Sequence, residues 1–95
     1  MDEQKFVLVC TDKRGVFAGY GPTTPDEGGG ITLTDARMCL YWPSECHGVL
    51  GLASVGPLRG SRVGPAVPTL TLTGITAIAE VTDDARDLWL ATPWE

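Results

Sequence analysis

The sequence predicts a mainly β fold: a small barrel of about five short, strongly bent strands, with a helical insertion and a C-terminal helix. Three observations predict it. The chain has 95 residues, the length of one small domain, so residues 1–95 are treated as one unit. Apolar and polar residues alternate over short stretches, as in half-buried strands. In two stretches this alternation shifts by one residue, which requires a bulge or a sharp bend.

The first two predicted strands form a hairpin. Residues 5–11 are apolar and rich in β-branched side chains, as is typical of a strand. A polar turn over residues 12–15 leads to a second apolar run over residues 16–20. The next loop, residues 22–30, holds two prolines and three consecutive glycines, so we expect it to be exposed.

The third strand is predicted to bend near Asp35. Ile31 and Leu33 alternate with threonines, as in a strand with one buried face. After Asp35 the apolar positions shift by one, to Ala36, Met38, Leu40 and Trp42. A bulge at this point would place both sets on one side of the sheet. The alternative is that the second half is buried on both faces.

An insertion is predicted over residues 43–68. Pro43 ends the third strand, and the apolar residues that follow are spaced more like a short helix than a strand. The end of the insertion is a loop rich in glycine and proline. The last two strands follow over residues 69–73 and 75–81, with Gly74 at the corner between them.

A helix over residues 83–91 is predicted to close the chain. Thr82 can cap it, and acidic residues fill its first turn, where the helix dipole favours them. Trp89 and Trp94, with the neighbouring leucines, give more apolar area than one short helix on a small domain needs. A domain of this size also buries little surface by itself. We therefore expect a homo-oligomer, either a dimer or a ring.

Composition and charge exclude several classes of function. No apolar run approaches the roughly 18 residues of a membrane-spanning helix, so we expect no membrane association. The formal net charge of −5 disfavours nucleic acid as a partner. The first residues lack the features of a secretory signal, so we expect a reducing, intracellular compartment.

The cysteines and the histidine predict no metal site and no catalytic site. Cys10, Cys39 and Cys46 are odd in number, and no two of them form a C-x-x-C pair. Cys46 and His47 are neighbours that would point to opposite faces of a strand, which makes them a poor metal pair. No partner that would orient a Cys–His nucleophile is evident. We expect no cofactor, no metal and no enzymatic activity.

Two groups of residues are candidates for a ligand-binding site. The loop 56–65 combines glycines, which let the backbone approach a ligand, with Arg59, Ser61 and Arg62, which can bind phosphate or carboxylate. Arg37, Tyr41 and Trp42 form the second group, because an arginine beside an aromatic ring can contact a phosphate and stack on a base.

Arg14, in the first hairpin turn, is a third candidate that could point into a subunit interface or a ligand pocket. Each candidate also has a structural interpretation. The arginines of the loop and of the turn could simply be solvated. In the second group, Trp42 could belong to the core, and Arg37 could pair with Asp35 or Glu80.

The order of several β features resembles the Sm-like barrel family. The matching residues are Gly15 and Gly19 in the first hairpin, the stretch 31–36, and Leu72-Thr73-Gly74 followed by residues 75–81. The resemblance implies a bent five-stranded sheet that assembles into rings. The family's RNA-binding residues do not carry over, because Gly29-Gly30 and Thr73 stand where its asparagine and arginine would be. Residues 37–68 also replace a short loop of that family.

Over nearly its whole length the chain is also similar to short, uncharacterised proteins of tailed bacteriophages and prophages. The matching residues are Arg14-Gly15-Val16-Phe17 with Gly19-Tyr20, Ala36-Arg37-Met38 with Tyr41-Trp42, Gly51-Leu52-Ala53 with Gly56-Pro57, Ser61-Arg62, and Leu72-Thr73-Gly74 with Thr76. This similarity implies a phage origin and a location in the host cytoplasm. It implies no established activity.

These inferences lead to three hypotheses about function. The first is a non-enzymatic, homo-oligomeric sponge that sequesters a nucleotide-derived signal of host defence. Arg14, Arg37 and Arg62 would then contact phosphate at subunit interfaces, and Tyr41 or Trp42 would stack on a base. The second is a phage interaction or structural component that binds a host or virion protein. The third is an RNA- or DNA-binding protein of the Sm-like type.

Overall fold

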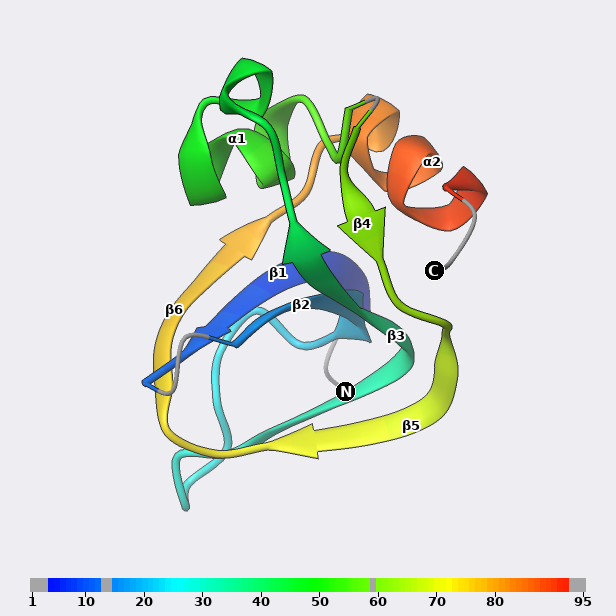
Figure 1. Ribbon diagram of the computed structural model, residues 1–95. Helices are drawn as coiled ribbons and strands as arrows, with labels where there is room; N and C mark the ends of the chain where they lie inside the picture. Colours follow the sequence, from blue (N-terminus) through cyan, green and yellow to red (C-terminus); the bar gives the residue numbers. More distant parts are fainter. Residues whose placement is uncertain (1–3, 13–14, 59, 93–95) are drawn as a thin grey trace.

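A computed structural model describes residues 4–12, 15–58 and 60–92. Within this part, one antiparallel sheet of six strands runs in the order β4-β3-β2-β1-β6, and β5 also pairs with β3 (Figure 1). The elements are β1 (Lys5–Thr11), β2 (Val16–Gly21), β3 (Ile31–Tyr41), the 3-10 helix η1 (Ser44–Cys46), α1 (Gly48–Ser54), β4 (Arg62–Val63), β5 (Val67–Leu72), β6 (Ile75–Glu80) and α2 (Asp83–Ala91). The prediction of a mainly β fold with two helical segments is confirmed.

The described strands do not close into the predicted five-stranded barrel. β5 and β6 follow one another through the corner at Gly74, yet they lie at different ends of the sheet, β5 on β3 and β6 on β1. No ladder joins β5 to β6 within the described residues. The sixth strand, β4, comes from the predicted insertion, where it pairs with the end of β3. The sheet is therefore bent and open.

β3 bends at the predicted position. Asp35 has a φ of 52°, and the register between β2 and β3 shifts between Ala18 and Tyr20, so β3 carries an extra residue there. Gly19 faces this bulge, and a Cβ at Gly19 would lie 3.0 Å from the Cα of Ala36. A glycine is therefore needed for the close approach of the two strands.

Beyond the bulge, the predicted phase of β3 is wrong. Arg37 and Cys39 are buried, whereas Met38 and Leu40 are 37% and 49% exposed. This half of β3 faces the helical layer, where Arg37 meets backbone carbonyls and Cys39 joins an apolar cluster. The sequence pattern predicted that only apolar residues of β3 would be buried. Arg37 can be buried as well, because its guanidinium is hydrogen-bonded.

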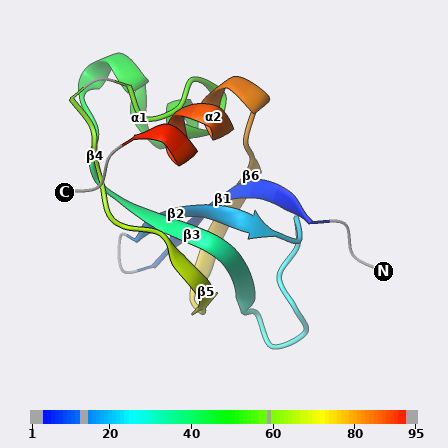
Figure 2. The ribbon, with the colours of Figure 1, turned by 90° about the vertical axis from the view of Figure 1, so that its right-hand side faces the viewer.

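The sheet has an apolar layer on each face. On one face, Phe6 and Leu8 of β1 pack with residues of the helical layer, including Leu52 and Trp89. On the other face, the alternate β1 residues Val7 and Val9 pack inside the bend of the sheet, with Ile31, Leu33 and Ala36 of β3. The two α helices lie together over the first face (Figure 2). β1 is thus buried on both sides.

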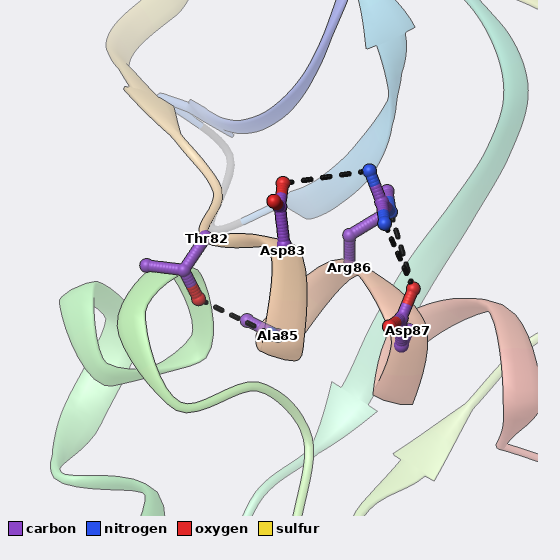
Figure 3. A network of polar contacts seen from close by, with 5 residues as sticks. All are labelled: Thr82, Asp83, Ala85, Arg86 and Asp87. Carbon is purple, nitrogen blue, oxygen red and sulfur yellow. Dashed lines mark hydrogen bonds and ion pairs between the residues drawn. The ribbon is translucent and has the colours of Figure 1, made fainter.

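α2 begins at the predicted cap. The hydroxyl of Thr82 accepts a hydrogen bond from the backbone N–H of Ala85 at 3.1 Å, which satisfies a donor of the first turn (Figure 3). The same hydroxyl donates to the carbonyl of Ser54 at 2.9 Å and so ties α2 to the end of α1. The prediction of a Thr82 cap is confirmed.

The expected subunit contact through Trp89 is wrong, because Trp89 is fully buried within the chain. Its indole N–H donates to the carbonyl of Leu52 at 3.0 Å, which joins α2 to α1. Trp94 lies outside the described residues. Of the neighbouring leucines, Leu88 and Leu90 remain 37% and 46% exposed.

The described helices include none that is long and apolar enough to span a bilayer.

Candidate functional site

The pairing of β3 with β4 brings the two groups of predicted site residues together. Tyr41 lies directly opposite Arg62, and both are exposed. The register shifts between Cys39 and Tyr41, so β3 carries Leu40 as an extra residue beside this pair. Trp42 and Ser61 are the adjoining residues of the same two segments. We call these four residues, Tyr41, Trp42, Ser61 and Arg62, the Tyr41–Arg62 surface.

Contacts to the helical layer hold this surface in place. Trp42 is half-buried and packs against the apolar cluster under the helices. The hydroxyl of Ser61 lies 3.7 Å from the sulfur of Cys46, which is fully buried. That sulfur also accepts a hydrogen bond from the backbone N–H of Leu58 at 3.4 Å. The loop before β4 is therefore anchored at its apolar side, and Arg62, the first residue of β4, is exposed.

Arg37 does not belong to the Tyr41–Arg62 surface. It is only 6% exposed, and its Nε donates to the carbonyl of Gly64 at 2.7 Å. Its Nη1 donates to the carbonyls of Trp89 and Thr92, both at 2.6 Å. These partners are backbone carbonyls, where the sequence suggested a carboxylate. Because its guanidinium is occupied in this way, we assign Arg37 a structural role rather than a role in ligand binding.

Arg37 stabilises the end of α2. The last carbonyls of a helix lack partners within the helix and carry partial negative charge, so a buried guanidinium there is favourable. Burial lowers the pKa of Arg37 below its ordinary value, but an arginine remains charged at any physiological pH. Arg37 therefore connects β3 with the chain just after β4 and with the end of α2.

The other predicted residues do not gather at this surface. Arg14 and Arg59 lie outside the described residues. His47 is exposed and has a φ of 63°, between η1 and α1, while the adjacent Cys46 is buried. Within the described ranges, no group of three or more histidine, cysteine and acidic residues is placed to hold a metal ion.

The three cysteines are free thiols in apolar surroundings. Burial raises the pKa of Cys39 to about 11, and the thiol donates to the carbonyl of Tyr41 at 3.4 Å. Burial also raises the pKa of Cys10. A raised pKa reduces the fraction of thiolate, which is the reactive form. Cys10 and Cys39 therefore lack the environment of a nucleophile.

Cys39 is expected to resist alkylation by iodoacetamide at pH 8 in the folded protein. A thiol with a pKa of about 11 is roughly 0.1% ionised at that pH, about a hundredfold less than one at 9. Mass spectrometry of digested protein should show Cys39 labelled only after unfolding in urea. As a control, the partly exposed Cys10 should be labelled before it. Labelling of Cys39 at the rate of an unfolded thiol would contradict the buried placement.

A groove that sequence reasoning missed lies where the ends of β1, β2 and β6 meet the start of α2. It has a volume of about 360 Å³ and is lined by Gln4, Lys5, Phe6, Tyr20, Glu80, Val81, Asp83 and Arg86. Lys5 pairs with Glu80 at 3.2 Å. Arg86 pairs with Asp87 at 3.1 Å and with Asp83 at 3.5 Å (Figure 3).

The groove offers little net charge to a ligand, because each of its cations already has a carboxylate partner. The hydrogen bond to Asp87 raises the pKa of Arg86, which keeps the guanidinium charged. The spacing of three residues between Asp83 and Arg86 on one helix was a sequence signal for their pairing. The pairing of Lys5 with Glu80 had no such signal, since only the β1–β6 ladder brings them together. We take the Tyr41–Arg62 surface as the candidate site, because the pairing of β3 with β4 brings four predicted site residues together there.

The described residues define a small mainly β domain, with a six-stranded sheet and helices packed on one face. Residues 4–89 match the family model described as Domain of unknown function (DUF6948), and the chain belongs to this family. No curated protein and no solved structure matches the chain. The similarity to Sm-like barrels and to phage proteins therefore stays a prediction from the sequence.

Proposed function

We propose that this protein is a non-enzymatic binding module that holds a small anionic, nucleotide-like ligand on the Tyr41–Arg62 surface. The observation that carries the proposal is the register of β3 and β4, which sets Tyr41 opposite Arg62 at an exposed position. A guanidinium binds phosphate with two parallel hydrogen bonds, and aromatic rings stack on bases. Ser61 adds a hydroxyl that can donate to a phosphate oxygen.

The charge of the chain favours a small ligand over a nucleic acid. The net charge of −5 acts on every phosphate of a long polyanion, whose backbone extends over much of the protein surface. A ligand with one or two phosphates contacts only the surface around Arg62. Its binding therefore depends on local hydrogen bonds and stacking more than on the net charge.

The similarity to short proteins of tailed phages, which is predicted from the sequence, is the basis for the biological role proposed here. We place the protein in the cytoplasm of an infected host, as a homo-oligomer that sequesters a nucleotide-derived signal of host defence. Sequestration requires affinity and copy number, and no bond in the ligand has to be broken. It needs only the surface described above.

Calorimetric titration tests the proposal, with AMP, cyclic di-AMP and inorganic phosphate as separate probes. We expect saturable binding of at least one nucleotide, and a loss of at least about tenfold in affinity, or about 1.4 kcal/mol, for Arg62→Ala. Tyr41→Ala is expected to weaken nucleotide binding more than phosphate binding, because it removes a stacking ring.

The matched control is Arg86→Ala, which removes the same charge from the groove near α2 and should leave the affinity unchanged. Absence of binding for every probe contradicts the proposal. An equal loss of affinity in Arg62→Ala and Arg86→Ala would also contradict it, since the effect would then reflect overall charge.

A second candidate function is the binding of a host or virion protein through the same region. Tyr41, which pairs with Arg62, is 54% exposed, and the adjacent Leu40 is 49% exposed. Tyrosine and arginine are enriched among the residues that dominate protein interfaces. Stoichiometric capture of one protein by the wild type, lost in Arg62→Ala, together with no nucleotide binding, would favour this function.

A further inference from the structure

The outer edge of β5 is open. On its inner side, β5 pairs with β3 in one unbroken register, from Ala36 opposite Val67 to Ile31 opposite Leu72. On its outer side, no strand is paired with it within the described residues (Figure 1). Every residue of β5 is exposed or half-buried. Such an edge presents unpaired N–H and C=O groups to any strand that approaches.

β5 lacks most of the features by which proteins protect an edge strand. β6, the strand at the other end of the sheet, has a register shift against β1 next to Thr11 and ends at Glu80. Bulges and charges of this kind discourage pairing between molecules. Residues 63–79, by contrast, contain no charged side chain, although 20% of the whole chain is charged. On β5 only Pro68 interrupts the edge, near its beginning.

We propose that β5 pairs antiparallel with β5 of a second copy of this chain, about a two-fold axis. This deepens the homo-oligomeric part of the proposed function and rests on it. The second copy is the fitting occupant because two chains of net charge −5 repel each other except where they meet through uncharged surface. A cationic partner would gain nothing from this edge. A two-fold contact uses the same surface on both chains.

The side chains of β5 match one another in this arrangement. With Leu70 opposite Leu70 of the second copy, Thr69 of each chain lies opposite Thr71 of the other. Thr71 already contacts Thr32 of β3, with 3.3 Å between the hydroxyl oxygens, so one row of threonines would cross the interface. Leu70 and Leu72 lie half-buried against the apolar layer inside the bend, and pairing would cover them further.

Exposed apolar side chains extend this contact at one end of β5. Val67 is paired with Ala36 and is 37% exposed, and Met38, two residues further along β3, is exposed to the same extent. Ala36 and Met38 are alternate residues of β3, so Met38 lies beyond the Ala36–Val67 pair along that strand. Covering Val67 and Met38 adds apolar burial to the hydrogen bonds between the two edges.

Sedimentation equilibrium of the full chain, over micromolar to millimolar concentrations, tests the inference. The wild type should have twice the chain mass of 10.1 kDa. The double variant Thr69→Lys/Thr71→Lys should have the mass of one chain, because it places four ammonium groups on the two paired strands. Both positions are exposed, and circular dichroism should show that the variant keeps its fold.

Two single variants, which each add one positive charge per chain and together match the charge change of the double variant, serve as controls. Thr23→Lys changes an exposed residue of the loop between β2 and β3, and Thr76→Lys changes an exposed residue of β6. Both should remain dimeric. A monomeric wild type, a dimer that survives the double variant, or a dimer that Thr76→Lys breaks equally well would overturn the inference.

The two proposals fail separately. A monomeric wild type that still binds a nucleotide through Arg62 would overturn the β5 contact and leave the binding function intact. A dimer that the double variant breaks, but that binds none of the probes, would support the β5 contact and contradict the binding function.

Discussion

The Gly51→Ala variant is expected to lose about 3 kcal/mol or more of folding free energy. A Cβ at Gly51 would overlap the carbonyl oxygen of Cys46 and lie 2.7 Å from its carbonyl carbon. Both atoms belong to the backbone, so no side-chain rotation can make room. The clash can be relieved only if η1 and α1 move apart. That movement would disturb Leu52 and Cys46, which are fully buried in the layer beneath them.

Urea unfolding measures this loss, and Gly28→Ala is the matched control. A Cβ at Gly28 would meet only a carboxylate oxygen of Asp26, at 3.5 Å, in an exposed loop. We expect its stability to change by less than about 0.5 kcal/mol. Equal stability of the two variants would show that η1 and α1 do not pack as closely as described.

The Arg37→Met variant is expected to lose about 3 kcal/mol of folding free energy. Methionine fills part of the volume but leaves the carbonyls of Gly64, Trp89 and Thr92 without their donor. Arg37→Lys should recover less than half of the loss, because a single ammonium cannot span carbonyls that a planar guanidinium reaches from two sides. In Arg37→Met, the rate of amide hydrogen exchange should increase most in the last turn of α2.

Urea unfolding of Arg37→Met, with Arg86→Met as a control, provides the measurement. Arg86 lies on the exposed side of α2 and pairs with carboxylates, so its loss should change stability little. Wild-type stability in Arg37→Met, or full recovery of stability in Arg37→Lys, would contradict the structural role of Arg37.

Local signals in the sequence predicted the features that depend on neighbouring residues. The one-residue shift in alternation after Leu33 indicated the bulge at Asp35, because register against a neighbouring strand leaves a trace in the apolar pattern. Thr82, followed by acidic residues, indicated the start of α2 because a cap satisfies a donor only three residues away. Gly74 indicated the corner before β6, where its φ is 69°.

Features that depend on distant contacts could not be predicted in the same way. The pattern assigned Met38 to the core and Arg37 to the opposite face, and the structure reverses this. The decisive partners of Arg37 are carbonyls at Trp89 and Thr92, more than fifty residues away, and a carbonyl has no sequence signature. Likewise, the sequence predicted that Trp89 would be available for a subunit contact. Its partner, the carbonyl of Leu52, lies in another element and leaves no local signal near Trp89.

The residue types of the candidate site could be predicted from the sequence, but their arrangement could not. Tyr41 with Trp42, and Ser61 with Arg62, were each recognisable from their residue types. That they form one surface depends on the two-residue strand β4, which lay within a segment predicted to be a loop. That Arg62 binds phosphate stays a proposal, and Arg37 is held by three backbone carbonyls.

Native mass spectrometry of freshly purified protein is the most direct test of the central claim, that the Tyr41–Arg62 surface holds a nucleotide-like ligand. We predict an extra mass of a few hundred daltons per chain that fragments to a nucleotide. That mass should be absent from Arg62→Ala and present in Arg86→Ala. A spectrum of bare protein in all three cases, joined with silent nucleotide titrations, would contradict the claim.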